Sequence, residues 1–144
     1  MKESFRFAFL KTIPVMLGYL FLGLAFGLLL QEAGYSFWWA LLISAIVYAG
    51  SIQFVLVSFL TAGTSLPVVA VMTLLINSRH AFYGLTFIEK FKAMKSRPYM
   101  IFSLTDETYS LLCSLKVPEG MDEKKVMFLI SLLDQIYWII GSVV

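Results

Sequence analysis

Ionisable side chains lie near the middle of several long apolar stretches of this sequence. They are Arg79, His80, Asp106, Glu107 and Asp134. An ionisable side chain inside lipid hydrocarbon costs about 2.5–3.5 kcal/mol even on lenient insertion scales. Chance placement would scatter such residues toward the ends of the stretches, where long side chains reach water. Charges at this depth indicate a pathway for polar solutes or protons.

Amides, hydroxyls and glycines occur at the same depth and extend the candidate set. Helical spacing predicts one polar stripe through Ser103, Glu107, Ser110 and Ser114 and a second through Ser131, Asp134, Gln135, Trp138 and Ser142. It also predicts that Asn77, His80 and Gly84 share a face, and that Arg79 and Tyr83 share another. The candidate binding or coupling residues are therefore Tyr48, Gly50, Ser51, Gln53, Asn77, Arg79, His80, Tyr83, Asp106, Glu107 and Asp134.

Simpler interpretations stay open for these residues. Arg79 can pair with a carboxylate merely to hold helices together, and His80 is as well explained by packing as by a proton relay. A metal site is not expected, because the only histidine and the only cysteine, Cys113, match no ligand spacing. No phosphate loop or nucleophile motif is present either. We expect no cofactor, and an intramembrane enzyme using His80 and an acid is the least favoured hypothesis.

The composition requires lipid as the solvent for much of the surface. Of the 144 residues, 60% are hydrophobic and 14% charged, and the mean hydropathy is +0.85. Soluble domains have about 45–50% apolar and about 25% charged residues. The net charge is only +2 and its basic residues form short clusters, which argues against nucleic acid as a partner.

The expected architecture is all-α, a polytopic integral membrane protein with about five hydrophobic segments. They are 13–30, 37–60, 66–88, 98–116 and 126–144, each near the ~20 residues that cross a bilayer. The first is too long for a signal peptide and is read as a retained span. We expect one transmembrane helical domain over 1–144. The chain stops at Val144 without a polar anchor, from which we expect a longer natural protein.

The positions of the basic clusters predict an interrupted segment. The positive-inside rule places both 2–11 and 90–97 in the cytoplasm, and so the N-terminus too. Two cytoplasmic clusters need an even number of crossings between them, yet three hydrophobic segments lie there. Either one segment does not cross fully, or one basic cluster departs from the rule. We therefore expect a broken or re-entrant segment near Gly50 or Asn77, lining a cavity.

Three motifs resemble the AzlC family of branched-chain amino acid permeases, the large subunits of LIV-E type exporters. The motifs are 48–54 (YAGSIQF), 77–84 (NSRHAFYG) and 104–107 (LTDE), in the same order and at similar intervals as in that family. The resemblance implies a secondary transporter of the cytoplasmic (inner) membrane that exports valine, leucine, isoleucine or methionine. It also implies a small hydrophobic AzlD-type partner subunit, and further hydrophobic segments that this chain lacks.

An amino acid substrate suits the charges that the sequence offers. Arg79, or a broken-helix N-terminus near Gly50 and Ser51, could hold the carboxylate. Asp106 or Glu107 could hold the ammonium group or take up a coupling proton. The alternative function is an assembly subunit of a membrane complex, in which these charges only pack helices.

Overall fold

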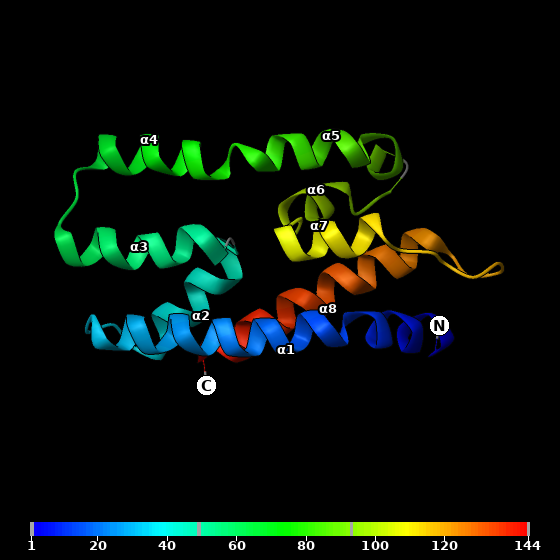
Figure 1. The fold of residues 1–144 in the computed structure, drawn as a ribbon, viewed down its shortest axis with the longest axis horizontal. Helices are drawn as coiled ribbons and strands as arrows, with labels where there is room; N and C mark the ends of the chain where they lie inside the picture. Colours follow the sequence, from blue (N-terminus) through cyan, green and yellow to red (C-terminus); the bar gives the residue numbers. More distant parts are fainter. Residues whose placement is uncertain (1, 49, 93, 144) are drawn as a thin grey trace.

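The computed structural model describes residues 2–48, 50–92 and 94–143, and every regular element in those ranges is an α-helix. The expected all-α class is therefore confirmed. The helices are α1 (Lys2–Glu32), α2 (Phe37–Ile46), α3 (Gly50–Ala62), α4 (Leu66–Asn77), α5 (Arg79–Lys92), α6 (Arg97–Phe102), α7 (Asp106–Cys113) and α8 (Glu123–Val143). Most of them run along the long axis of the molecule (Figure 1).

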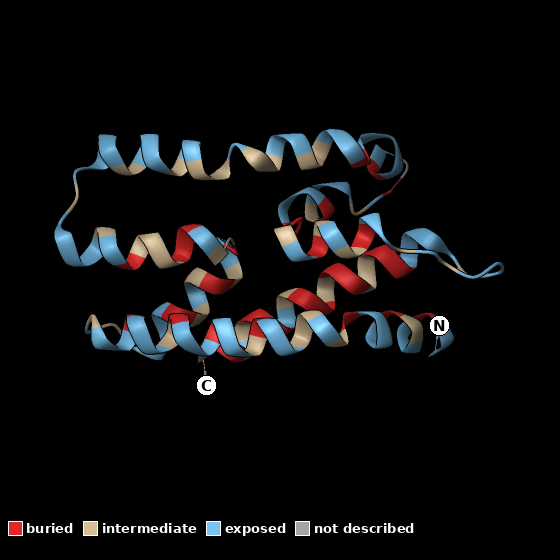
Figure 2. Cartoon of the chain, viewed as in Figure 1, coloured by how far each residue is buried: buried red, intermediate tan, exposed pale blue. Residues whose placement is uncertain are grey.

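Two of these helices are long and apolar enough to cross a membrane, namely α1 and α8. At 1.5 Å per residue, their 31 and 21 residues extend about 46 and 31 Å, against a hydrocarbon layer of about 30 Å. They pack against each other and carry much of the buried surface (Figure 2). The contact is close because glycines lie at it: Gly23 and Gly27 of α1 face Gly141 and Ser142 of α8.

Taken together, α4 and α5 are also long and apolar enough for a third crossing. The two helices are separated only by Ser78 and meet at a bend of 44°. Figure 1 shows that they continue in one direction along the molecule rather than turning back. The expected interruption near Asn77 is thus confirmed as a bend. It also means that Asn77 and His80 do not share one regular helical face.

The segment 37–60 turns back and does not cross. In Figure 1, α2 runs from one end of the molecule to its middle, and α3 returns to the same end. With 10 and 13 residues, these helices are about half to two-thirds of a bilayer long. At the tip Tyr48 has a φ of 39°, a left-handed conformation that costs a residue with a side chain about 1–2 kcal/mol. The expected break near Gly50 is confirmed, although Ala49 lies outside the described residues.

The segment 98–116 is also a helical hairpin, which the sequence did not indicate. A continuous helix carrying one serine stripe was predicted there, and that prediction is wrong: α6 ends at Phe102 and α7 begins at Asp106. Thr105 caps α7 by accepting a hydrogen bond from the backbone N–H of Thr108. Asp106 and Glu107 in the first turn stabilise this helix start, because their negative charges interact with the partial positive charge of the helix N-terminus. Ser103 is consequently buried at the turn, whereas Ser114 is exposed at the far end of α7.

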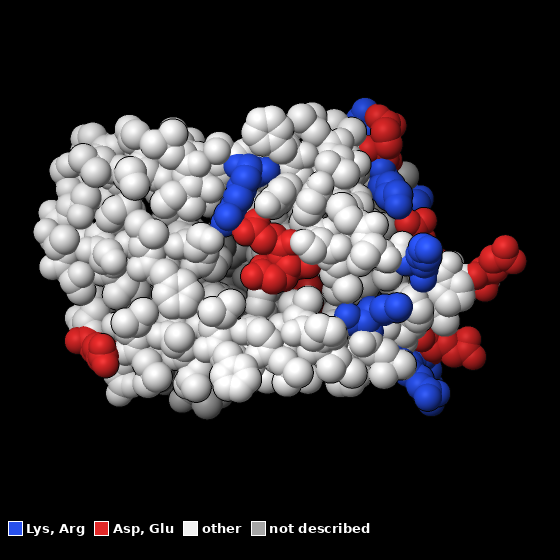
Figure 3. Space-filling view, in the orientation of Figure 1, with Lys and Arg blue, Asp and Glu red and all other residues white. Residues whose placement is uncertain are grey.

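The charged groups mark the two ends of the long axis and one place between them. Figure 3 shows most lysines, arginines and acidic residues at the end where the N-terminus lies, and a small group of opposite charges in the middle of the molecule. The C-terminal end of α5 and the N-terminal end of α6, with the basic residues that they carry, lie at that same end (Figure 1). Since α2 and α3 turn back, only α1 and the α4–α5 pair cross between the two basic clusters, which gives an even number.

This topology predicts which residues react from the same side of the membrane. In a Cys113→Ser background, cysteines replacing Glu3 and Lys92 are expected to show the same response to a membrane-impermeant thiol reagent in intact cells. A cysteine replacing Glu32, at the other end of α1, is expected to show the opposite response. All three positions are exposed on the protein. Opposite labelling of positions 3 and 92 would contradict the turned-back α2–α3 hairpin.

Candidate functional site

A cavity of about 210 Å³ lies where the interrupted helices meet. The tip of the α2–α3 hairpin, the bend between α4 and α5, the tip of the α6–α7 hairpin and the sides of α1 and α8 all contribute to it. The lining residues are Tyr19, Leu22, Tyr48, Gly50, Ser51, Phe54, Arg79, His80, Thr105, Asp106, Glu107 and Trp138. In the space-filling view this is the hollow beside the central charges (Figure 3).

Arg79 connects three of these elements from the first position of α5. Its Nη1 lies 2.9 Å from Oδ2 of Asp106, the first residue of α7, and its Nη2 donates a hydrogen bond of 2.7 Å to Oγ of Ser51 in α3. The Nε of Arg79 and the Oδ1 of Asp106 are buried and have no hydrogen-bond partner in the described part of the chain. The ion pair therefore leaves one donor and one acceptor without a hydrogen bond, and these two atoms can bind a polar ligand.

Three helices begin at this cavity. Gly50 is the first residue of α3, Arg79 of α5 and Asp106 of α7, and all three line the cavity. The backbone N–H groups of a helix's first turn lack intrahelical partners and carry a partial positive charge. Asp106 and Glu107 oppose that charge at α7, whereas the first turns of α3 and α5 contain no acidic residue. The α3 and α5 side of the cavity thus favours an anionic group.

Glu107 supplies a negative charge on another side of the cavity. Its Oε2 accepts a hydrogen bond of 3.1 Å from the hydroxyl of Tyr19 in α1. Among the described residues no lysine, arginine or histidine forms a salt bridge with it. The cavity therefore holds an arginine with its carboxylate partner, and a second carboxylate to which no described cation is bonded. A cationic and an anionic group on different sides of one cavity can bind the two opposite charges of a zwitterion.

Four candidate residues from the sequence lie outside the cavity lining. Gln53 is buried behind it, where it accepts a 3.0 Å hydrogen bond from Nε1 of Trp138 and donates one of 3.3 Å to Ser44. Tyr83 stacks on Tyr109 with ring centroids 4.1 Å apart. Asn77 ends α4, and Asp134 is fully buried in α8. The other candidates, Tyr48, Gly50, Ser51, Arg79, His80, Asp106 and Glu107, line the cavity together.

The lining also contains residues that were not selected from the sequence. Tyr19 and Leu22 come from α1, whose central part has no charge that would draw attention to it. Thr105 and Phe54 belong to two of the motifs, and Trp138 to the predicted polar stripe of α8, so a signal existed for these three. Among the residues that the structure describes, no group of His, Cys, Asp and Glu is arranged to hold a metal ion.

Membrane-length helices joined to half-length helices, with the helix breaks gathered around a charged cavity, define a polytopic membrane protein built from discontinuous helices. Residues 14–144 match the family described as AzlC protein, and the chain belongs to that family.

Three relatives illustrate the similarity. A Helicobacter pylori protein named as an uncharacterized membrane protein is 45% identical over 143 residues, covering 99% of this chain and 63% of the relative. The branched-chain amino acid transport protein AzlC of Bacillus subtilis is 35% identical over 142 residues, 98% of this chain and 56% of its own length. The inner membrane protein YgaZ of Escherichia coli is 32% identical over 102 residues, 69% and 42% respectively.

The chain thus spans roughly three-fifths of the length of the Helicobacter pylori and Bacillus subtilis relatives. No solved structure gives a significant match.

Proposed function

We propose that this chain forms the substrate-binding part of a membrane transporter for branched-chain amino acids. The observation that carries the proposal is the cavity in which Arg79, Asp106 and Glu107 converge at the breaks of discontinuous helices. In secondary transporters, substrates bind near mid-membrane at such breaks, with half-helix N-termini directed at anionic groups. The name of the Bacillus subtilis relative supports this substrate class.

The cavity has the size and lining for one such amino acid. A cavity of about 150 Å³ takes a benzene molecule, and this one measures about 210 Å³. Leu22, Phe54 and Trp138 supply an apolar wall for the branched side chain. One methylene in an apolar pocket is worth only about 1–3 kcal/mol, so we expect valine, leucine, isoleucine and methionine all to bind, with affinities that differ by no more than roughly 200-fold.

The substrate's two charged groups are assigned to opposite sides of the cavity. The carboxylate binds Arg79 and the N-termini of α3 and α5, competing with Asp106 for the guanidinium group. The ammonium group binds Glu107, with which no described cation forms a salt bridge. His80 lies beside Arg79 and packs against Tyr83 at a ring distance of 5.7 Å, so we give it a positioning role.

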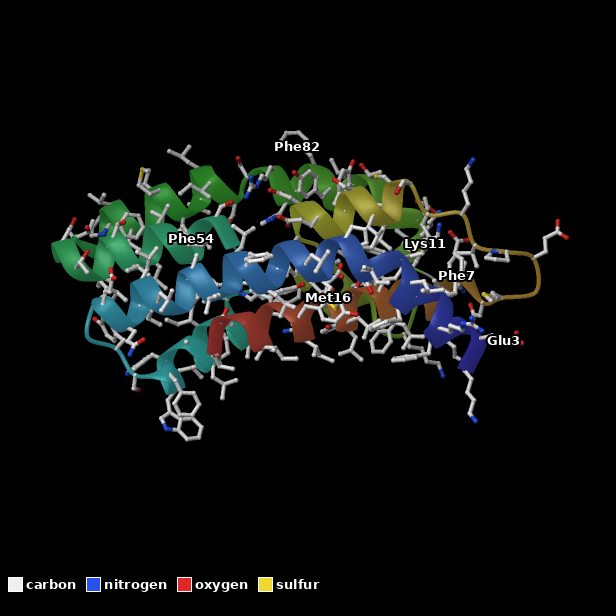
Figure 4. The ribbon with its side chains drawn as sticks, turned by 60° about the horizontal axis from the view of Figure 1, so that its bottom comes forward. Glu3, Phe7, Lys11, Met16, Phe54 and Phe82 are labelled. Atoms are coloured by element: carbon white, nitrogen blue, oxygen red, sulfur yellow. The ribbon has the colours of Figure 1, made fainter. Side chains whose placement is uncertain are left out.

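The same proposal includes the membrane in which the transporter lies, its orientation there and its partner subunit. The cytoplasmic (inner) membrane holds it with the N-terminus in the cytoplasm, as the basic residues at one end of the molecule support. Within α4, all of which is described, no residue is buried, and Leu66, Leu74 and Leu75 are more than half exposed. Lipid and a small hydrophobic AzlD-type subunit cover this apolar face. Figure 4 shows Phe82 of α5 likewise pointing away from the bundle.

The function is tested by ligands that lack one charge each. We expect purified protein to bind L-leucine, and to bind isoamylamine, which lacks the carboxylate, and 4-methylpentanoate, which lacks the ammonium group, at least about tenfold more weakly. Each missing charge removes a charge-assisted contact between the ligand and the site, which costs more than about 1.4 kcal/mol. Isothermal titration calorimetry measures the three dissociation constants. Equal affinity for all three ligands, or no binding of L-leucine, would contradict the proposal.

An assembly role for the subunit is the second candidate function. It is favoured by the fact that Arg79 already has two protein partners, Asp106 and Ser51. In that case the ion pair only joins α5 to α7 and α3. The ligand series separates the two functions, since an assembly subunit binds none of the three compounds while still forming a stable complex with its partner subunit.

A further inference from the structure

Behind the cavity lies a buried carboxyl group that the proposed substrate contacts do not use. Asp134 of α8 has no exposed surface. Its Oδ2 accepts a hydrogen bond of 2.8 Å from the hydroxyl of Thr108, and its Oδ1 is buried without a partner in the described part of the chain. A buried carboxylate is expensive unless it is paired with a cation or fully hydrogen-bonded.

The groups around Asp134 do not include a cation that neutralises it. The titratable side chains that face it are Tyr19 of α1, Tyr48 after α2, Tyr99 of α6 and Glu107 of α7. All of them are neutral or negative. Arg79 is engaged with Asp106 at 2.9 Å, and no lysine, arginine or histidine among the described residues forms a salt bridge with Asp134. Protonation is therefore the available way to neutralise this carboxyl group.

A continuous chain of hydroxyl groups joins Asp134 to the cavity. Thr108 donates to Asp134, and Thr105 donates to Thr108 over 3.0 Å. Thr105 in turn is hydrogen-bonded to Tyr19. The hydroxyl of Tyr19 reaches Oε2 of Glu107 at 3.1 Å. Thr105 and Thr108, in the middle of the chain, are buried. Every link is a direct side-chain hydrogen bond, so the chain is complete without a bridging water.

We propose that Asp134 is the proton-binding site of the transporter and that it exchanges its proton with Glu107 through Tyr19, Thr105 and Thr108. Protonated Glu107 gives its proton to the Tyr19 oxygen as Tyr19 passes its own to Thr105, Thr105 to Thr108, and Thr108 to Asp134. Each hydroxyl gains one proton as it loses one. Glu107 ends as a carboxylate and Asp134 as a carboxylic acid, so the total charge is unchanged.

The exchange links the proton to the substrate. Glu107 must be a carboxylate to pair with the substrate's ammonium group, so binding of the amino acid favours the state in which the proton lies on Asp134. The two carboxyl groups then have separate roles, one at the substrate and one deeper in the protein. This inference rests on the proposed function for the substrate, whereas protonation of Asp134 is a property of the protein alone.

The first test reads protonation without any transport assay. Infrared difference spectra of the purified protein are recorded as the pH is raised. We expect a carboxylic-acid carbonyl band that disappears in Asp134→Asn and stays in the control Asp122→Asn, which removes an exposed carboxylate before α8. Asparagine has the shape of a protonated aspartate and can still accept from Thr108, so the fold is expected to persist. Absence of an Asp134-dependent band at every pH would overturn the proposal.

The second test separates coupling from substrate binding. In proteoliposomes, Asp134→Asn is expected to accumulate at least about tenfold less leucine than the unchanged protein under an imposed pH gradient, whereas the control Asp122→Asn stays within about twofold. Thr108→Val, which cuts the chain, is expected to slow this accumulation, and Thr108→Ser to restore it. Accumulation that persists in Asp134→Asn would overturn the inference, as would accumulation that follows a sodium gradient instead. If the unchanged protein neither binds nor exchanges leucine, the proposed function fails, while the infrared result still decides whether Asp134 carries a proton.

Discussion

Replacing Arg79 with glutamine is expected to weaken leucine binding by roughly 30-fold or more. Among the described residues that line the cavity, Arg79 carries the only permanent positive charge. Its loss removes the carboxylate's partner while leaving Asp106 and Glu107 to repel it. Removing one member of a hydrogen-bonded charge pair costs about 2–5 kcal/mol, and about 1.4 kcal/mol is a factor of ten. The lower end of that range applies, because the Arg79 and Asp106 side chains are each 38% exposed.

Matched variants separate a binding role for Arg79 from a structural one. Arg79→Lys keeps the charge but loses the planar fork that contacts Asp106 and Ser51 together, so an intermediate loss is expected. The double variant Arg79→Gln with Asp106→Asn removes the unpaired carboxylate. We expect it to recover the yield of folded protein but not the affinity for leucine, measured by calorimetry on detergent-purified protein. Recovery of both would show that the ion pair only holds helices together.

Replacing Gly141 with leucine is expected to disrupt the packing of α8 on α1. A Cβ atom at Gly141 would lie 2.8 Å from the carbonyl oxygen of Tyr19, and one at Gly23 would lie 2.9 Å from the backbone of Gly141. These neighbours are backbone atoms, which cannot rotate away, so the two helices must separate along their contact. Overpacking typically costs about 1–3 kcal/mol and sometimes more. This would lower the melting temperature by about 4–12 °C if each kcal/mol shifts it by about 4 °C.

The partner helix offers a matched control for this substitution. Gly18 lies in α1, is exposed, and a Cβ atom added to it would meet no other atom within 4 Å among the described residues. Gly18→Leu is therefore expected to leave the melting temperature within a few degrees of the unchanged protein. Thermal unfolding followed by tryptophan fluorescence measures both variants, since Trp138 lies on α8 close to the affected contact. Equal melting temperatures for Gly141→Leu and Gly18→Leu would contradict the close helix contact.

Some of the helix breaks could be predicted from the sequence and others could not. The breaks near Gly50 and Asn77 could be expected, because three hydrophobic segments between two basic clusters require one that does not cross. The break at Ser103–Thr105 could not, since a serine every three or four residues is equally compatible with a continuous helix. The capping residue Thr105 and the acidic first turn of α7 were present in the sequence, yet they competed there with an uninterrupted apolar pattern.

The sequence by itself determined that this is an all-helical membrane protein of the AzlC family, because hydropathy and local motifs depend on residues close together in the chain. It also indicated that ionisable groups lie near the middle of the hydrophobic segments. Only the tertiary structure decided which of them meet. Arg79 pairs with Asp106 rather than with Glu107 or Asp134, and Tyr19 joins the site from a helix without charge at its centre. These choices depend on how two hairpins, a bent span and a glycine-packed helix pair fit together, and such contacts between distant residues leave no local pattern in the sequence.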